Sequence, residues 1–296
     1  MRILRKADWF DSDGFPVVIA REDPQSPLEM HTHEFSEIVI ITGGSGVHVA
    51  DGDQWVLSAG DVFVIGGDRP HHYVDTDHLR LINVLFDSDS LEMPLQDLAT
   101  LPGYNTLFHL EPAARQRHQF ESRLRISSAD MHEVCRLVDC LENELKMRER
   151  GFRFIAMATF MQLVGHLSRC YGRTKNLDSQ SLLQIAEVIG YIEKNYSKPI
   201  SLDELVDISG LSRRSFSRVF ESSMGCTPIS HLIELRISRA CELLKNTERS
   251  ITEIAFDVGF NDSNYFARQF RKILNVSPST YRQSAINPGG SIASVD

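Results

Sequence analysis

Two segments of the chain, residues 200–228 and 249–278, repeat one another. They align at an offset of 49 residues and, after one inserted residue, at an offset of 50. So many coincident positions are improbable by chance, so this part of the chain must fold as a duplicated unit. The aligned residues are Ser201 with Ser250, Glu204 with Glu253, Leu205 with Ile254, Gly210 with Gly259, Arg218 with Arg268, Phe220 with Phe270, and Thr227-Pro228 with Ser277-Pro278.

Each repeat predicts a short helix, a tight turn and a second helix. The Ser-x-x-Glu pattern is a capping box, which starts one helix at 201 and another at 250. About eight residues later a glycine permits the left-handed backbone that ends a helix. The second helix carries two phenylalanines four positions apart, which share one buried face. This is the helix-turn-helix plan, over 201–223 and 250–274, whose second helix enters the major groove of DNA.

The polar faces of the two second helices carry the candidate DNA contacts. Arginine pairs bidentately with O6 and N7 of guanine, so we expect Arg218 and Arg268 to make the main polar contacts. The net charge of the chain is −9, but residues 212–282 hold 11 Lys and Arg against 7 Asp and Glu. A locally basic surface favours nucleic acid. The candidates are Arg213, Arg214, Ser217, Arg218, Ser263, Asn264, Ala267 and Arg268.

The segment PISHLIELRISRACELLKN, between the repeats, predicts one long helix. Its roughly 18 residues span about 27 Å. Successive major-groove faces recur every ~34 Å, so this helix could hold the two units near adjacent grooves of one duplex.

The first part of the chain has a different pattern. Residues 16–86 alternate short β-branched runs with Gly- and Asp-rich breaks, which predicts a small antiparallel barrel or sandwich. Residues 87–128 read as irregular. The next forty residues read as two helices, and the second is apolar nearly all round, so it needs the barrel or a second subunit as partner.

We therefore predict an α+β chain of two domains, a small β-barrel with a helical pair followed by an all-α double helix-turn-helix domain. The five cysteines lie in helical segments, and no run approaches the roughly 18 apolar residues of a membrane span, so we expect a cytoplasmic, thiol-reduced protein without membrane partners. The expected boundaries are 1–128 for the barrel, 129–171 for the dimerising helical pair, 172–180 for a linker, 181–284 for the DNA-binding domain and 285–296 for a flexible tail.

Histidines mark a candidate ligand site in the barrel. In HTHEFSE, strand alternation places His31, His33 and Glu37 on one inward face, and His71 follows later. Two His, one carboxylate and a distant third His are the donors with which cupin barrels hold a divalent metal.

The end of the second repeat resembles a known family. The stretch ITEIAFDVGFNDSNYFARQFRKILNVSPSTYR is similar to the signature of the AraC/XylS transcription regulators nearly throughout, including Gly259-Phe260 and the closing Pro278-x-x-Tyr281-Arg282. One departure is Val206, which stands in the first unit where Ala255 stands in the second. The resemblance implies promoter DNA and RNA polymerase as partners, a homodimer, and base or phosphate contacts by the residues named above.

The barrel resembles cupins and, within the same family, the sensor domains of rhamnose-operon activators. The similarity lies in HTHEFSEIVIITGGSGVHV, the spacing to Gly60-Asp61, the His71-x-Tyr73 pair and LINVLF. It implies a monosaccharide effector such as L-rhamnose. The expected ligand-binding residues are His31, His33, Glu37, His71, Trp55 and Tyr73, of which His31, His33, Glu37 and His71 are the candidate metal ligands.

Several hypotheses remain open for this site. The histidines serve a metal that helps to hold a sugar, or a metal-free sugar pocket with convergent donors and acceptors, or only barrel packing. A regulator of a non-sugar ligand is a further alternative, and so is a metal-dependent cupin enzyme, a sugar isomerase or a dioxygenase. The duplicated DNA-reading unit favours a transcriptional activator and disfavours an enzyme.

Overall fold

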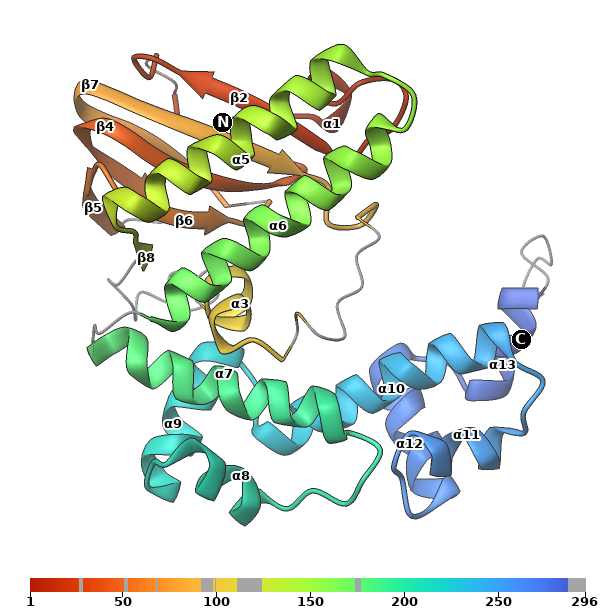
Figure 1. The fold of residues 1–296 in the computed structure, drawn as a ribbon. Helices are drawn as coiled ribbons and strands as arrows, with labels where there is room; N and C mark the ends of the chain where they lie inside the picture. Colours follow the sequence, from red (N-terminus) through yellow and green to blue (C-terminus); the bar gives the residue numbers. More distant parts are fainter. Residues whose placement is uncertain are drawn as a thin grey trace. The chain divides into compact units, whose positions relative to one another are not determined.

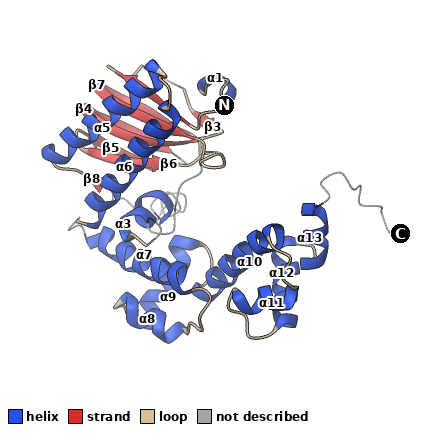
Figure 2. Cartoon of the chain, turned by 45° about the vertical axis from the view of Figure 1, so that its right-hand side comes forward, coloured by secondary structure: helices blue, strands red, loops and turns tan. Residues whose placement is uncertain are grey.

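The structure is a computed structural model that describes residues 1–26, 29–50, 53–67, 69–91, 98, 100–110, 124–173 and 177–286. The chain divides into two compact units. The first holds Met1–Gly190 and Ser222–Met224, and the second holds Tyr191–Glu221 and Gly225–Asp296. Figure 2 shows that the strands lie in the first unit, as the α+β prediction requires.

The first unit is built on an eight-stranded sheet. Its two longest strands, β4 and β7, pair antiparallel along their whole length, with irregular register between Ile41 and Val47. A bulge of this kind bends a sheet. The strands are β1 (Arg2–Leu4), β2 (Val17–Glu22), β3 (His31–His33), β4 (Ser36–Ala50), β5 (Asp53–Ser58), β6 (Asp61–Ile65), β7 (His71–Phe86) and β8 (Leu124–Arg125).

The predicted sheet-rich first domain is confirmed, but the sheet formed by its described strands does not close into a complete barrel. Among the described strands the pairing runs β1-β3-β7-β4-β6-β8, with β2 on β7 and β5 on β4, and it does not return to β1. A barrel closes only if its end strands pair. Here the two end strands, β1 and β8, do not pair with each other.

The two faces of the sheet form separate cores, as strand alternation demands. Ile38 and Ile40 face helices α5 (Ser128–Met147) and α6 (Phe152–Gly172) in one core, whereas Val39 and Ile41 face the other side. Figure 1 shows α5 and α6, drawn in green, lying across one face of the sheet. The predicted helical pair is therefore confirmed, and the sheet is a partner of the apolar α6.

Part of the segment that we expected to be irregular is helical. After α1 (Lys6–Trp9) and the strands, α3 (Pro102–Asn105) begins at a proline and continues as a π-helix, η1 (Thr106–Leu110). Proline suits the first helical position, where no amide donor is needed. Leu107 and Leu110 are fully buried, so packing on α6 stabilises these turns.

Helices make up the rest of the chain. Residues 174–176 of the predicted linker lie outside the described residues, whereas 177–180 begin α7, because a helix once nucleated extends through polar residues. Of the predicted tail, 285–286 belong to α13 and 287–296 are not described. The helices are α7 (Leu177–Asn195), α8 (Leu202–Ser209), α9 (Arg213–Met224), α10 (Pro228–Asn246), α11 (Ile251–Asp257), α12 (Ser263–Leu274) and α13 (Pro278–Ile286).

The long helix predicted between the repeats is α10, and Figure 1 shows α9 and α12 near its two ends.

In the described part of the chain, no helix combines the length and the apolar character that crossing a bilayer requires.

Candidate functional site

Both predicted capping boxes are present. The Ser201 hydroxyl accepts from the amide of Glu204 at 3.2 Å, and the Ser250 hydroxyl accepts from the amide of Glu253 at 3.2 Å. In each box the glutamate side chain also accepts from the amide of its serine. The short helices α8 and α11 therefore begin where the repeated sequence indicates.

The two turns use the repeated glycines. Gly210 has φ of +64° and Gly259 has φ of +94°, both in the left-handed region. Gly259 also lies against the chain that follows α7, since a Cβ there would stand 2.6 Å from the carbonyl oxygen of Tyr196. The second turn thus needs glycine for its backbone angle and for its close approach.

Helices α9 and α12 are anchored by aromatic pairs. Phe216 and Phe220 are fully buried with ring centroids 5.7 Å apart, and Phe266 and Phe270 repeat this at 5.6 Å. Because these rings fix one face of each helix, the other face turns to solvent. The two helices therefore present equivalent outer surfaces.

The predicted DNA contacts lie on these outer surfaces. Three of them, Arg214, Arg218 and Arg268, are exposed. None of the three forms an ion pair with another described residue. Arg213 is exposed but forms an ion pair with Asp203 of α8. Asn264 is exposed as well, while Ser217, Ser263 and Ala267 are half-buried.

A second candidate site lies on the sheet face away from α5 and α6. Nε2 of His71 lies 3.3 Å from Oε1 of Glu37, and Nε2 of His33 lies 3.7 Å from the same oxygen. One donor atom from each of these three residues lies within 4.8 Å of the others. His31 is not in this triplet, but its ring centroid is 4.3 Å from that of His71. The structure thus brings together all four predicted metal ligands, three of them around one point.

Backbone carbonyls orient these rings. Nδ1 of His31 faces the carbonyl of Glu29 at 2.9 Å, Nδ1 of His71 faces that of Arg69 at 3.0 Å, and Nδ1 of His33 faces that of Phe35. A carbonyl oxygen only accepts, so each Nδ1 carries the proton and a neutral ring offers its Nε2 lone pair. This is how proteins orient histidine ligands of a metal.

The arrangement fits a cation. Two Nε2 lone pairs and a carboxylate oxygen would repel one another, so either a proton on one ring or a metal ion must lie between them. Burial would raise the pKa of Glu37, but its interactions with the His33 and His71 imidazoles outweigh burial and lower that pKa. The carboxylate is therefore charged at neutral pH, as a metal ligand must be. Two His and one carboxylate suit a divalent transition metal.

Comparison with known proteins identifies both domains. The AraC-like ligand binding domain family matches residues 16–164, and a helix-turn-helix domain family matches residues 205–284. The chain is 32% identical over 284 residues to the HTH-type transcriptional activator RhaS of Enterobacter sp. strain 638, which covers 96% of this chain and 98% of the relative.

The chain belongs to the AraC family of DNA-binding transcriptional regulators. The RhaS protein of Citrobacter koseri is 31% identical over 287 residues, covering 96% of this chain and 98% of the relative. The solved DNA-binding domain of AdpA in complex with a target DNA is similar to 36% of this chain over 98% of its own length, with 31% identity and a TM-score of 0.34.

In this AraC-family chain, sequence reasoning missed two basic residues beside Arg268. A shallow depression on α12 is bordered by Arg268, Arg271 and Lys272, together with Asn264 and the start of α13 at Pro278. Arg271 and Lys272 are exposed and follow Arg268 by three and four positions, which places them on its side of the helix. That spacing was the available signal. The basic surface of the second unit is thus larger than predicted.

His48 was also missed. It is buried, and it lies in register with Trp55 on β5 and Tyr73 on β7, so the three form one row across three strands. Its ring centroid is 4.4 Å from Trp55, 5.2 Å from Tyr73 and 5.4 Å from His71. The signal was a histidine inside the apolar run GVHVA.

The cavity beside the histidines accommodates only some of the predicted ligand residues. Its lining includes His31, Glu37, His71 and Tyr73, but neither His33 nor Trp55. Burial raises the pKa of Tyr73, so its hydroxyl stays protonated. The cavity volume is about 50 Å³, well below the few hundred Å³ typical of ligand pockets, so a ligand must move side chains to enter.

Proposed function

We propose that this AraC-family regulator activates transcription from promoter DNA when a monosaccharide, L-rhamnose or a close relative, occupies the histidine site. The observation that carries the proposal is the pair of equivalent outer faces on α9 and α12, each with an exposed arginine, Arg218 and Arg268. Its effector class is supported by the similarity to RhaS activators along 96% of the chain.

The same residues define how the histidine site would work. His33, Glu37 and His71 would hold a divalent metal, which would supply a coordination point for sugar hydroxyls. The remaining residues act directly. His31 accepts through Nε2, and the buried Tyr73 hydroxyl, which has no hydrogen bond to the described residues, donates to a sugar oxygen.

The sugar controls the protein by differential affinity. A ligand shifts an equilibrium only as far as it binds the active arrangement more tightly than the resting one. We propose that the active form is a cytoplasmic homodimer, joined through α5 and α6, that contacts RNA polymerase.

DNA titrations test the first part. We expect Arg268→Ala to weaken binding of the full-length protein to its promoter by about 1 to 3 kcal/mol and to relax the preference at one base position. Arg80→Ala, which removes the same charge from an exposed position on β7 of the first unit, is the matched control and leaves binding unchanged. An unaltered preference in Arg268→Ala across promoter variants would show that this residue does not read a base.

Thermal unfolding tests the effector. L-Rhamnose and other monosaccharides are added to the full-length protein, with and without a chelator, because a ligand specific to the folded state raises its melting temperature. We expect a shift for rhamnose that Tyr73→Phe and His31→Ala reduce. If none of the sugars shifts the wild type in either condition, the monosaccharide assignment is wrong while the DNA-binding result stands.

A further inference from the structure

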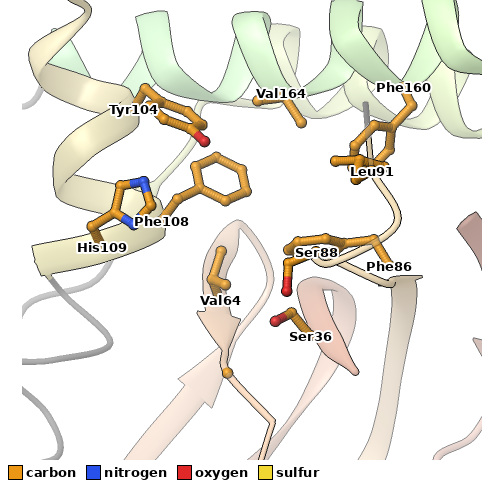
Figure 3. A pocket seen from close by; sticks show the side chains of 11 residues that line it. Ser36, Val64, Phe86, Ser88, Leu91, Tyr104, Phe108, His109, Phe160 and Val164 are labelled. Atoms are coloured by element: carbon orange, nitrogen blue, oxygen red, sulfur yellow. The ribbon is translucent and has the colours of Figure 1, made fainter. Parts of the chain in front are cut away.

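A second cavity lies on the opposite face of the sheet from the histidines. It has a volume of about 340 Å³ and lies between the edge of the sheet, α6 and the helical turns at 102–110. This size falls within the range of small-molecule sites. Figure 3 shows the principal lining side chains, which are Val64 and Phe86 on the sheet, Phe160 and Val164 on α6, and Tyr104 and Phe108 on α3 and η1.

The walls of this cavity are aromatic. The ring centroids of Phe86 and Phe160 are 5.8 Å apart and tilted, and those of Phe86 and Phe108 are 6.4 Å apart, edge to face. Tyr104 stacks on Phe108 at 5.0 Å. Rings that meet edges and faces in this way favour an aromatic guest, which gains contact energy beyond simple burial.

One tyrosine hydroxyl is directed into this apolar space. Tyr104 is only 7% exposed, its hydroxyl points into the cavity, and it forms no hydrogen bond within the described part of the chain. Burial raises the pKa of Tyr104, so the group is a donor at neutral pH. Ser36 and Ser88 face one another across the cavity floor (Figure 3). This hydroxyl is a donor that a guest inside the cavity can reach, so a guest that accepts its hydrogen bond is favoured over one that leaves it unpaired.

The lining also restricts the charge of a guest. Among the described lining residues none is Lys, Arg, Asp or Glu, and burial lowers the pKa of His109, which favours its neutral form. A charged guest would lose its hydration without gaining an ion pair. A polyol such as a sugar needs more convergent donors and acceptors than the three hydroxyls and one imidazole of this lining provide.

We propose that this cavity is a second effector site, for a neutral aromatic molecule with one hydrogen-bonding substituent such as a phenolic hydroxyl. Tyr104 donates to the substituent and the phenylalanines enclose the ring. The site is separate from the histidine site, because Ser36 lines the aromatic cavity whereas its neighbour Glu37 faces the histidines across β4.

Calorimetric titration of the full-length protein with 4-ethylphenol tests the proposal. Tyr104→Phe removes only the hydroxyl, so we expect affinity for 4-ethylphenol to fall ~5- to 10-fold while affinity for ethylbenzene is unchanged. Val164→Trp fills the cavity and abolishes binding of both probes. We expect 4-ethylbenzoate, the anionic analogue, to bind at least ~10-fold more weakly than 4-ethylphenol.

Two controls locate the probe. Phe154→Ala truncates an exposed apolar side chain at the start of α6, and Glu37→Gln alters the histidine site, and we expect both to bind 4-ethylphenol like the wild type. Should Val164→Trp fail to fold, Tyr104→Phe decides alone. The proposal is overturned if the wild type does not bind 4-ethylphenol, or if Tyr104→Phe binds both probes with wild-type affinity. These measurements use neither DNA nor sugar, so their outcome does not depend on whether the proposed function is correct.

Discussion

Nε of Arg236 on α10 donates to the carbonyl oxygen of Tyr196 at 2.7 Å, and Nη2 donates to that of Lys198 at 2.8 Å. The same guanidinium lies over the ring of Phe260, 5.7 Å from its centroid. One side chain of the connecting helix therefore joins the end of α7 to the turn of the second helix-turn-helix unit. Phe260 packs in turn on Phe266 of α12, with ring centroids 5.2 Å apart, so Arg236 is linked to the helix that carries Arg268.

Arg236→Met should therefore destabilise the second unit. It leaves two carbonyl oxygens without their charged donor, which corresponds to a loss of about 2 to 3 kcal/mol. Urea unfolding of the full-length chain measures this loss of stability. The control is Lys194→Met, at an exposed position of α7. Equal midpoints for the two variants would mean that water replaces the guanidinium at no cost.

The turn glycine gives a second prediction, with a matched control in the same chain. Gly259 and Gly151 have nearly the same φ, +94° and +90°. A Cβ on Gly151 meets nothing within 4 Å, whereas one on Gly259 would stand 2.6 Å from the Tyr196 carbonyl. Gly151→Ala therefore measures backbone strain alone, about 1 to 2 kcal/mol. Gly259→Ala adds the steric overlap, and we expect its urea midpoint to fall further. If the two losses are equal, the Tyr196 segment moves away freely.

The features that sequence reasoning predicted correctly are local or periodic. The capping boxes at Ser201 and Ser250 depend on residues three positions apart, and the inward face of His33 and Glu37 follows from strand alternation. The resemblance to the AraC family predicted the types of both domains for the same reason, because it depends on contiguous motifs.

The features that were missed depend on long-range pairing. The row of His48 with Trp55 and Tyr73 exists only once the register of three strands is known. Whether the sheet closes depends on which strands pair at its edges, which no local pattern reveals. Tyr104 lines a cavity because α3 packs on α6, a contact between segments some sixty residues apart in a stretch whose prolines suggested irregular structure.

The histidine site gives a dependence of stability on pH. Burial lowers the pKa of His31 to about 4, and repulsion from His71 adds to this effect. An unfolded histidine titrates near 6.5, so between pH 6.5 and 4 the unfolded chain binds more protons and stability falls as the pH falls. Below the folded pKa the loss reaches its full size, about 3 kcal/mol.

His31→Gln removes this titration and keeps a donor for the Glu29 carbonyl. We expect the first unit of this variant to lose about 3 kcal/mol less than the wild type between pH 6.5 and 4. Denaturant unfolding at a series of pH values, with a chelator present throughout, measures the difference. If the free energy of unfolding of the wild type and of His31→Gln changed with pH in parallel, His31 would be solvated and the inference from its burial would be wrong.

The proposed dimer makes the last prediction. Met147 is 63% exposed, Phe154 76% and Ile155 46%, and these three large apolar side chains flank the turn between α5 and α6. Exposed apolar groups gathered in this way mark interaction surfaces. Placing a carboxylate in such an interface costs at least about 2 kcal/mol, so Phe154→Glu should weaken dimerisation ~30-fold or more. Val56→Glu makes the same change at a 68% exposed position on β5 and leaves the dimer intact. Sedimentation over a concentration series distinguishes them, and a Phe154→Glu protein that dimerises like the wild type would move the interface away from the helical pair.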